Sequence, residues 1–305
     1  MNTLSIEPNQ TFTRDRQTDH APGYLLKWRQ KQLLVRLGDQ VNAPYLPALE
    51  NPQQLVECLK HSPVEIVSLT PEIGEAKLTF WANACEQAGK MMFIRVPSTP
   101  ELPNKKAGIR WSLKRFIDRG TAALLLLLLS PVLLGLALLI MVRSPGPVFF
   151  TQWRVGERGK LFRILKFRTM AVGAEHLHHQ VMGQQTGLHK HTNDPRVTPL
   201  GRWMRKYSLD ELPQLLNVLR GEMSFVGPRP WALYDAVRIS PAMQHRLNAL
   251  PGITGVWQVA ARSKMRDIDA VNRCDLSYLS SWSLGQDFQI LLQTVPKVLS
   301  GFGAY

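Results

Sequence analysis

The highest density of reactive side chains lies in residues 202–214, which read RWMRKYSLDELPQ. Two acids, Asp210 and Glu211, are adjacent there. Three cations precede them: Arg202, Arg205 and Lys206. Acids beside cations at a helix start are expected to stay ionised at neutral pH. An ionised aspartate can attack phosphorus, while a second carboxylate can hold Mg²⁺, which bridges phosphate oxygens. The segment therefore suits covalent phosphoryl transfer.

A structural interpretation competes with this one. Ser208 and Glu211 form the S-x-x-E pattern of a capping box, in which each side chain binds the other's backbone N–H at a helix start. The two acids would then merely suit the positive end of that helix. An isolated pattern of this kind favours the cap, whereas the crowded cations favour an anion site on the same helix start.

Other basic clusters indicate the same class of substrate. Lys166 and Arg168 lie at the end of a predicted strand, and Arg229 lies in the rigid sequence Gly227-Pro228-Arg229-Pro230. Arginine binds phosphate oxygens with two parallel hydrogen bonds. For each cluster the alternative to phosphate binding is a solvent-exposed basic surface near lipid. The residues expected to bind substrate are Lys166, Arg168, Arg202, Arg205 and Arg229.

Residues 121–142 read TAALLLLLLSPVLLGLALLIMV and carry no charge over 22 residues, enough for a helix to span a bilayer. Proline removes a backbone donor, so we expect a kink or break at Ser130-Pro131. Basic residues flank both ends, and the positive-inside rule places such flanks on the cytoplasmic side. We therefore predict a re-entrant helix that enters and leaves on one face; a single span and a buried soluble helix are the alternatives. The flanking cations are Lys105, Lys106, Arg110, Lys114, Arg115 and Arg119 before the run, and Arg143, Arg154, Arg158 and Lys160 after it.

Composition sets the class of partner. The chain has 305 residues, a net charge of +14 and a 45% hydrophobic share. Such charge favours nucleic acid, acidic lipid head groups or phosphorylated substrates. The first 30 residues have no apolar signal-peptide core, so we expect the chain not to be secreted. The three cysteines share no metal-ligand spacing and are expected to be free thiols.

The remaining pattern predicts an α+β fold in two parts. Residues 1–105 form an N-terminal extension of unknown role: about 25 disordered residues, a small α/β unit and a proline-containing linker at 98–106. Residues 106–305 form the catalytic domain, mainly helical with short strands. In the first part we expect strands at 33–37, 64–69 and 91–96 and helices at 53–60 and 72–89. In the second we expect strands at 148–150 and 162–165 and helices at 209–219, 241–248, 267–281 and 287–299.

A group of histidines gathers in one polar stretch: His176, His178, His179, His189 and His191. A zinc site is conceivable, but the spacing fits no strong template and no cysteine joins it. A mobile loop near the substrate entrance is the favoured interpretation.

The sequence from Lys114 to Tyr305 resembles the bacterial sugar transferase family, the monotopic phosphoglycosyl transferases. The landmarks are Lys114-Arg115-Phe116-Ile117-Asp118, Ser130-Pro131, Arg143-Ser144-Pro145-Gly146-Pro147, Lys166-Phe167-Arg168-Thr169-Met170, Asp194-Pro195-Arg196, Ser208-Leu209-Asp210-Glu211-Leu212-Pro213-Gln214, Gly227-Pro228-Arg229-Pro230 and Pro251-Gly252-Ile253-Thr254-Gly255. Ala261, where the family usually has glycine, and Cys274, where it usually has an aliphatic residue, are minor departures.

This resemblance implies a re-entrant membrane helix and a Mg²⁺-dependent, two-step reaction at the cytoplasmic face of the bacterial inner membrane. It implies that Asp210 attacks the β-phosphorus of a nucleotide sugar, UDP-linked in our expectation, and that polyprenyl (undecaprenyl) phosphate then takes the sugar phosphate. Glu211 would help Asp210 hold Mg²⁺, and Arg229 would contact the nucleotide sugar. The product would initiate exopolysaccharide or glycoconjugate synthesis.

Two other functions compete. A non-catalytic scaffold would use the basic face to bind acidic lipid, which leaves the acid pair Asp210-Glu211 unexplained. Nucleic-acid binding rests on charge alone, and because the uncharged run speaks against it we expect no nucleic-acid partner. The sugar, the polysaccharide pathway and the oligomeric state stay open, with a homodimer as one option.

Overall fold

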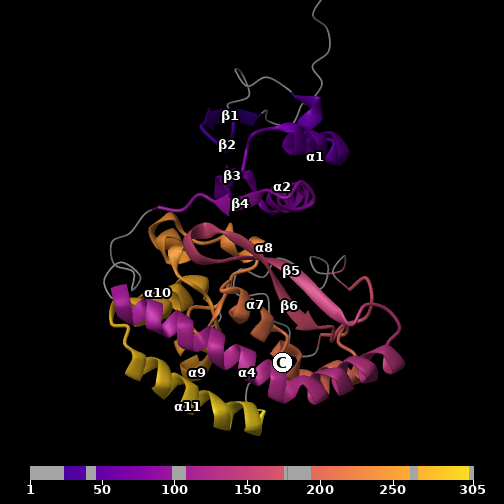
Figure 1. The fold of residues 1–305 in the computed structure, drawn as a ribbon, viewed down its shortest axis with the longest axis vertical. Helices are drawn as coiled ribbons and strands as arrows, with labels where there is room; N and C mark the ends of the chain where they lie inside the picture. The colour runs from indigo at the N-terminus through magenta and orange to yellow at the C-terminus, as the bar shows by residue number, and fades with distance from the viewer. Residues whose placement is uncertain are drawn as a thin grey trace, which may run out of the picture.

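The computed structural model describes residues 24–38, 46–97, 108–174, 177, 194–261 and 267–301. Within these residues an N-terminal α/β unit lies on a region of mixed helices and strands, and one long helix runs along the opposite side of that region (Figure 1). The mixture of helix and strand agrees with the α+β class expected from the sequence.

The N-terminal unit, residues 24–97, holds a four-stranded sheet in the order β1-β2-β3-β4. Its strands and helices are β1 (Tyr24–Arg29), β2 (Gln32–Leu37), α1 (Pro52–His61), β3 (Ile66–Leu69), α2 (Glu75–Gln87) and β4 (Met91–Ile94). The strands predicted at 33–37, 64–69 and 91–96 and the helix at 53–60 are confirmed, with slightly different ends. The helix predicted at 72–89 begins later because Gly74 adopts a φ of +86°. Strand β1 was not predicted, because its start was assigned to a disordered tail.

The long helix α4 (Gly108–Arg143) contains the whole uncharged run, with Pro131 inside it. Figure 1 shows this magenta helix changing direction part-way along, as expected of a helix that proline interrupts. In the described part of the chain it is the one helix long and apolar enough to cross a membrane. Most of its apolar side chains face outward; Leu127, for example, is 72% exposed. That α4 enters and leaves the membrane on the same face stays a prediction.

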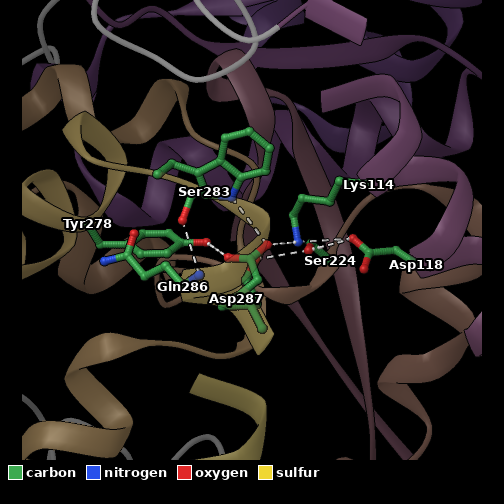
Figure 2. Close-up of polar contacts among 9 residues, drawn as sticks. Lys114, Asp118, Ser224, Tyr278, Ser283, Gln286 and Asp287 are labelled. Atoms are coloured by element: carbon green, nitrogen blue, oxygen red, sulfur yellow. Dashed lines mark hydrogen bonds and ion pairs between the residues drawn. The ribbon is translucent and has the colours of Figure 1, made fainter. Parts of the chain in front are cut away.

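A buried polar network joins the first half of α4 to the rest of the protein (Figure 2). The Lys114 Nζ atom lies 2.7 Å from Asp287 Oδ2 on α11 (Leu284–Ser300) and 3.4 Å from Asp118 Oδ2. The Asp118 carboxylate also accepts a 2.7 Å hydrogen bond from the Ser224 hydroxyl, and Asp287 accepts one of 2.5 Å from the Tyr278 hydroxyl. One cation thus balances two acids that come from different helices.

Three of the cations that flank the apolar run do not support the positive-inside prediction. Lys114 is buried, Arg154 is buried, and Arg115 pairs with Glu157 at 2.9 Å. Lys114 and Arg154 are therefore not exposed at the surface, and the charge of Arg115 is paired within the protein. The positive-inside argument must therefore rest on exposed cations such as Arg110 and Arg143.

The rest of the fold surrounds an antiparallel hairpin, β5 (Phe149–Val155) and β6 (Leu161–Phe167), which extends the two short strands that were predicted. The elements that follow are α6 (Pro199–Lys206), η4 (Leu209–Glu211), α7 (Gln214–Arg220), β7 (Ser224–Val226), α8 (Leu233–Ala236), η5 (Pro241–Asn248), β8 (Gly252–Thr254), α9 (Val256–Ala261), α10 (Ile268–Ser280) and α11. Helices predicted at 241–248, 267–281 and 287–299 are present, the first as a 3₁₀ helix. Strands β7 and β8 and helices α6, α8 and α9 were not predicted.

Candidate active site

The acid pair lies on a tight 3₁₀ turn, η4, between α6 and α7. Ser208, just before it, adopts a left-handed φ of +54° and its side chain makes no capping hydrogen bond. The capping-box interpretation is therefore wrong here, and Glu211 pairs with Lys166 of β6. The helix predicted at 209–219 is also wrong as a single element: Pro213 separates the turn from α7. A non-glycine residue at positive φ beside a reactive acid is a form of local strain typical of functional sites.

Asp210 is 8% exposed, so its carboxylate is largely removed from water. Burial raises the pKa of Asp210, and the neighbouring Glu211 raises it further, whereas Lys166 and Arg205 lower it. From the neighbouring cations and the predicted helix start alone we expected Asp210 to stay ionised, with no rise in its pKa. Burial outweighs them because it removes the water that would stabilise the charge. A desolvated carboxylate is a stronger nucleophile once ionised, since less solvation must be shed to reach phosphorus.

Two of the predicted cations lie at the acid pair. The Lys166 Nζ atom on β6 lies 2.7 Å from Glu211 Oε1. Arg205, in the last turn of α6, is fixed by a 2.9 Å hydrogen bond from its Nε atom to the Thr169 hydroxyl, and its charge acts on Asp210. These two cations offset part of the negative charge of the two acids.

Arg229 lies in a loop that the fold holds at several points. The Arg229 carbonyl accepts a 2.7 Å hydrogen bond from Arg246, whose guanidinium also pairs with the buried Asp275. Gly227 cannot carry a side chain, because a Cβ would lie 2.6 Å from the Leu250 carbonyl oxygen. The Arg229 guanidinium stacks over the Trp257 ring at 5.2 Å. The rigid loop expected from the sequence is confirmed.

The other two predicted cations lie elsewhere. Arg168 donates through Nε to the Pro147 carbonyl at 2.5 Å and through Nη1 to the Ser144 hydroxyl at 2.8 Å, so it closes the turn after α4. Arg202 is exposed and donates to the Val197 carbonyl at 3.3 Å. Neither contact is with the acid pair, and a substrate role for these two residues stays a prediction.

Sequence reasoning missed Arg154 as a site residue. Its guanidinium is buried, donates through Nη1 to the Pro230 carbonyl at 3.0 Å, and interacts electrostatically with both Arg229 and Glu211. Among the described residues, the buried Nε atoms of Arg154 and Arg229 have no hydrogen-bond partner. An unsatisfied buried donor is costly, so two of them in one region favour an anionic ligand. The sequence marked Arg154 as a basic residue after the apolar run and as one of the residues shared with the family, but gave it no role in substrate binding.

Tyr234 on α8 joins the same region. Burial raises the pKa of its phenol, and the charges of Arg154 and Arg229 oppose that rise. The hydroxyl therefore stays protonated at neutral pH. Nothing in the sequence pattern distinguished this tyrosine.

The turn that carries the acids also contacts the long helix. Leu209 and Leu212, which flank the pair, pack against a cluster that contains Leu136 and Ile140 from the second half of α4. The candidate nucleophile is thereby fixed to the same helix that exposes the apolar surface. This arrangement would let one site receive a lipid substrate and a water-soluble one.

The donor set at the acid pair is compatible with Mg²⁺. Two adjacent carboxylates, Asp210 and Glu211, are hard oxygen ligands, and Mg²⁺ typically combines one or two of these with substrate phosphates and water. No group of three or more His, Cys, Asp or Glu side chains that could hold a metal occurs within the described ranges. The protein alone therefore offers a partial ligand set, which phosphate oxygens would complete.

Several other acids and tryptophans have structural positions. Asp267 caps the start of α10 by accepting hydrogen bonds from two backbone N–H groups, and Asp275 is buried against Arg246. Trp231 and Trp257 are core residues, whereas Trp203 is 46% exposed. The five histidines between 176 and 191 lie outside the described residues.

Comparison with known proteins gives matches over the part of the chain that contains the acid pair. The sequence profile of a family described as "Bacterial sugar transferase" matches residues 109–301. A protein of Caulobacter vibrioides named UDP-glucose:undecaprenyl-phosphate glucose-1-phosphate transferase is 44% identical over 200 residues, covering 63% of this chain and 72% of that protein. The exopolysaccharide production protein ExoY of Rhizobium meliloti is 38% identical over 232 residues, covering 73% of this chain and 99% of that protein.

Larger relatives match over less of their length. The galactosyl transferase CpsE of Streptococcus agalactiae is 41% identical over 194 residues, which cover 63% of this chain and 43% of CpsE. The chain thus spans less than half of that protein. The matched region of this chain contains the acid pair, all but the first residue of the long helix, and Arg154 and Arg229. It excludes the whole N-terminal unit, residues 24–97.

Proposed function

Because the chain belongs to the bacterial sugar transferase family, we propose that it transfers a sugar 1-phosphate from a UDP-sugar to undecaprenyl phosphate. The relatives named as transferases or phosphotransferases of undecaprenyl phosphate support this acceptor, and the name of the Caulobacter protein supports a UDP-linked donor. The observation that carries the proposal for this chain is the buried Asp210 next to the partly exposed Glu211, with the cations Lys166 and Arg205 at hand. The buried Arg154, whose Nε atom has no hydrogen-bond partner, interacts electrostatically with Glu211.

In the first step the ionised Asp210 carboxylate attacks the β-phosphorus of the donor. A bond forms between the carboxylate oxygen and phosphorus, and the bond from phosphorus to the bridging oxygen breaks. That oxygen leaves with UMP, and the sugar phosphate stays on Asp210 as an acyl phosphate. The guanidinium groups of Arg154 and Arg229 would bind the diphosphate, and their Nε atoms, which have no hydrogen-bond partner, would stabilise its charge.

In the second step a phosphate oxygen of the lipid attacks the same phosphorus. The acyl–phosphate bond breaks, Asp210 regains its carboxylate, and a sugar-diphospholipid is released. Bound Mg²⁺ would supply charge neutralisation for the diphosphate that the two carboxylates would otherwise repel. Lys166, which balances Glu211 in the free enzyme, is free to turn to a phosphate once that acid is engaged.

The exposed apolar surfaces support a membrane location. On α11 the outward side chains include Phe288 at 63% exposure and Leu299 at 72%. Trp111 on α4 packs edge to face on Trp282, just before α11, with ring centroids 5.1 Å apart, so the two helices lie side by side. Figure 1 shows them together on the side away from the N-terminal unit. A face of this composition suits the cytoplasmic leaflet of the inner membrane.

If α4 is re-entrant, both of its ends should be accessible from the same side of the membrane. In a chain with its three cysteines replaced, we expect cysteines introduced at Arg110 and Arg143 to react with a membrane-impermeant maleimide in inverted inner-membrane vesicles. Neither should react from outside intact spheroplasts. Labelling of the two positions from opposite sides would establish a single span and overturn the re-entrant topology. A cysteine placed at the exposed Glu57 of the N-terminal unit serves as the cytoplasmic control.

The raised pKa of Asp210 predicts the pH dependence. The attacking form is the carboxylate, so kcat/KM should fall as pH drops through a pKa above the ordinary aspartate range. The Lys166 charge lowers the pKa of Asp210, so Lys166→Gln should move this acidic limb to higher pH. The profile is obtained from UMP release between pH 5 and 9 under subsaturating donor. An unmoved limb in the variant would show that Asp210 is not the group that titrates.

The function itself is tested by a donor screen. Purified protein in nanodiscs receives Mg²⁺, undecaprenyl phosphate and one of several UDP-sugars: glucose, galactose and N-acetylated amino sugars. We expect UMP, and not UDP, to be released with one or a few of these donors. Release of UDP, or lipid binding without turnover of any donor, would contradict the proposal, and the second result would support the scaffold interpretation.

A further inference from the structure

The N-terminal unit shares one hydrophobic core with the region of the proposed active site. Buried Trp81 of α2 belongs to the same cluster as Trp231, Leu233 and Ala236, which lie in and just before α8. Both tryptophans are fully buried. Figure 1 shows α2 lying directly over this part of the molecule. A core common to both parts means that the N-terminal unit is packed against the site region and is not tethered to it by a linker alone.

Backbone contacts join the two parts at the turn of the β5–β6 hairpin. Phe93 of β4 forms an antiparallel bridge with Lys160, which immediately precedes β6. Next to it, Gly159 adopts a φ of +78°, and a Cβ there would lie 2.1 Å from the Ile94 carbonyl oxygen. The hairpin turn is therefore fitted to the edge of the N-terminal sheet at van der Waals contact.

A polar clamp holds the outer face of the same hairpin. Arg163 on β6 donates to the Glu86 carboxylate through Nε at 2.8 Å and through Nη2 at 2.7 Å. Asn83 accepts from Arg163 Nη2 at 3.1 Å and from the Trp153 indole at 2.8 Å. The Arg163 guanidinium also stacks over the Trp153 ring at 4.5 Å. The planar guanidinium thus meets a carboxylate, an amide and a ring, all in a fixed geometry.

Strand alternation connects this clamp to the site. Successive side chains of a strand point to opposite faces, so Arg154 and Lys166 lie on the face opposite to Trp153 and Arg163. Arg154 reaches the Pro230 carbonyl and Lys166 reaches Glu211. On the backbone of β6, Asn217 of α7 accepts from Leu165 N–H and donates to the Arg163 carbonyl. The strand that bears Lys166 is therefore fixed from both sides.

We propose that residues 24–97 are part of the transferase scaffold, and that Arg163 is a positioning residue through which α2 sets the hairpin and hence Arg154 and Lys166. This inference rests on the proposed function, because the positioned groups are those that would bind the donor diphosphate. On this proposal the N-terminal unit, which lies before the region matched by the family profile, positions side chains of the site through the β5–β6 hairpin.

The test is a charge swap in the full-length protein in nanodiscs. Arg163→Glu and Glu86→Arg each break the clamp and place like charges together, whereas the double variant Glu86→Arg/Arg163→Glu restores an opposite-charge pair. We expect each single variant to raise the donor KM about tenfold, since small displacements of binding groups have large kinetic effects. The double variant should return KM to within about threefold of the wild type. KM does not depend on the folded fraction of a preparation, so loss of fold alone would not produce this pattern.

A second measurement, hydrogen exchange, does not depend on enzyme activity. Hydrogen exchange of peptides from residues 149–167 should quicken in both single variants and slow again in the double variant. Lys31→Glu, which breaks an exposed ion pair inside the N-terminal unit, is the matched control and should change neither quantity. Unchanged KM in both single variants, or a raised KM that the swap fails to restore, would overturn the inference. A wild-type protein that turns over no donor would instead contradict the proposed function, and exchange would then decide the structural part alone.

Discussion

Replacing Asp210 with asparagine should abolish transfer, with kcat reduced by at least about a thousandfold, as expected when a covalent nucleophile is removed. The amide keeps the size of the side chain but cannot form an acyl phosphate. UMP release measured with donor, Mg²⁺ and undecaprenyl phosphate gives the rate. Asp269→Asn on α10, where the acid accepts a hydrogen bond from Ser240, is the matched control and should keep near wild-type activity. Turnover by Asp210→Asn within about tenfold of the wild type would remove this aspartate as the nucleophile.

The same variant should not lose stability. A folded-state pKa above the unfolded value means that the ionised acid destabilises the folded protein, increasingly so as pH rises through the unfolded pKa. Asparagine carries no charge, so Asp210→Asn should melt at or above the wild-type temperature at pH 7, and the difference should shrink toward pH 4. An inactive but more stable variant would show that this site trades stability for reactivity.

The second large effect should come from Lys114, the cation at the centre of the network in Figure 2. Lys114→Met leaves the buried carboxylates of Asp118 and Asp287 without their common cation. Uncompensated buried charge typically costs about 3–5 kcal/mol, so we expect a fall of several degrees in the melting temperature in detergent. We also expect the first half of α4 to loosen from α11, which near-ultraviolet circular dichroism would report through Trp111 and Trp282.

Arg110→Met is the control for that experiment. Arg110 is an exposed cation four residues earlier on the same helix, and its loss should change the free energy of unfolding by less than about 0.5 kcal/mol. Equal melting temperatures for the Lys114 and Arg110 variants would contradict the view that the buried network anchors the helix.

The parts of the fold that could be predicted from sequence are those set by local pattern. Helices α10 and α11 and strands β2, β3 and β4 of the N-terminal unit depend on the pattern of neighbouring residues and were found close to their observed bounds. The uncharged run marked the C-terminal end of α4 but not its start at Gly108, and strand β1 was not predicted. Asp210 and Glu211 were found for a similar reason, because adjacent acids among cations are visible in a short window.

The parts that could not be predicted depend on long-range contacts. Asp118 meets Ser224 across 106 residues of sequence, and Arg163 meets Glu86 across 77. No local pattern tells that Lys114 and Arg154 are buried while Arg110 is exposed. The burial of Asp210, which reverses the expected direction of its pKa shift, likewise depends on long-range packing, because its neighbours Leu209 and Leu212 pack against Leu136 and Ile140 of α4.

The most direct test of the central proposal is to trap the sugar phosphate on the enzyme. Wild-type protein is mixed with the preferred UDP-sugar and Mg²⁺ without lipid acceptor, quenched within milliseconds to seconds, and examined by intact-mass and peptide mass spectrometry. We predict one sugar-phosphate adduct per chain, located at Asp210, with an equal amount of UMP, and its loss on addition of undecaprenyl phosphate. UMP that appears only when the lipid is also present, with no adduct on the protein, would show direct transfer between the two substrates and contradict the account.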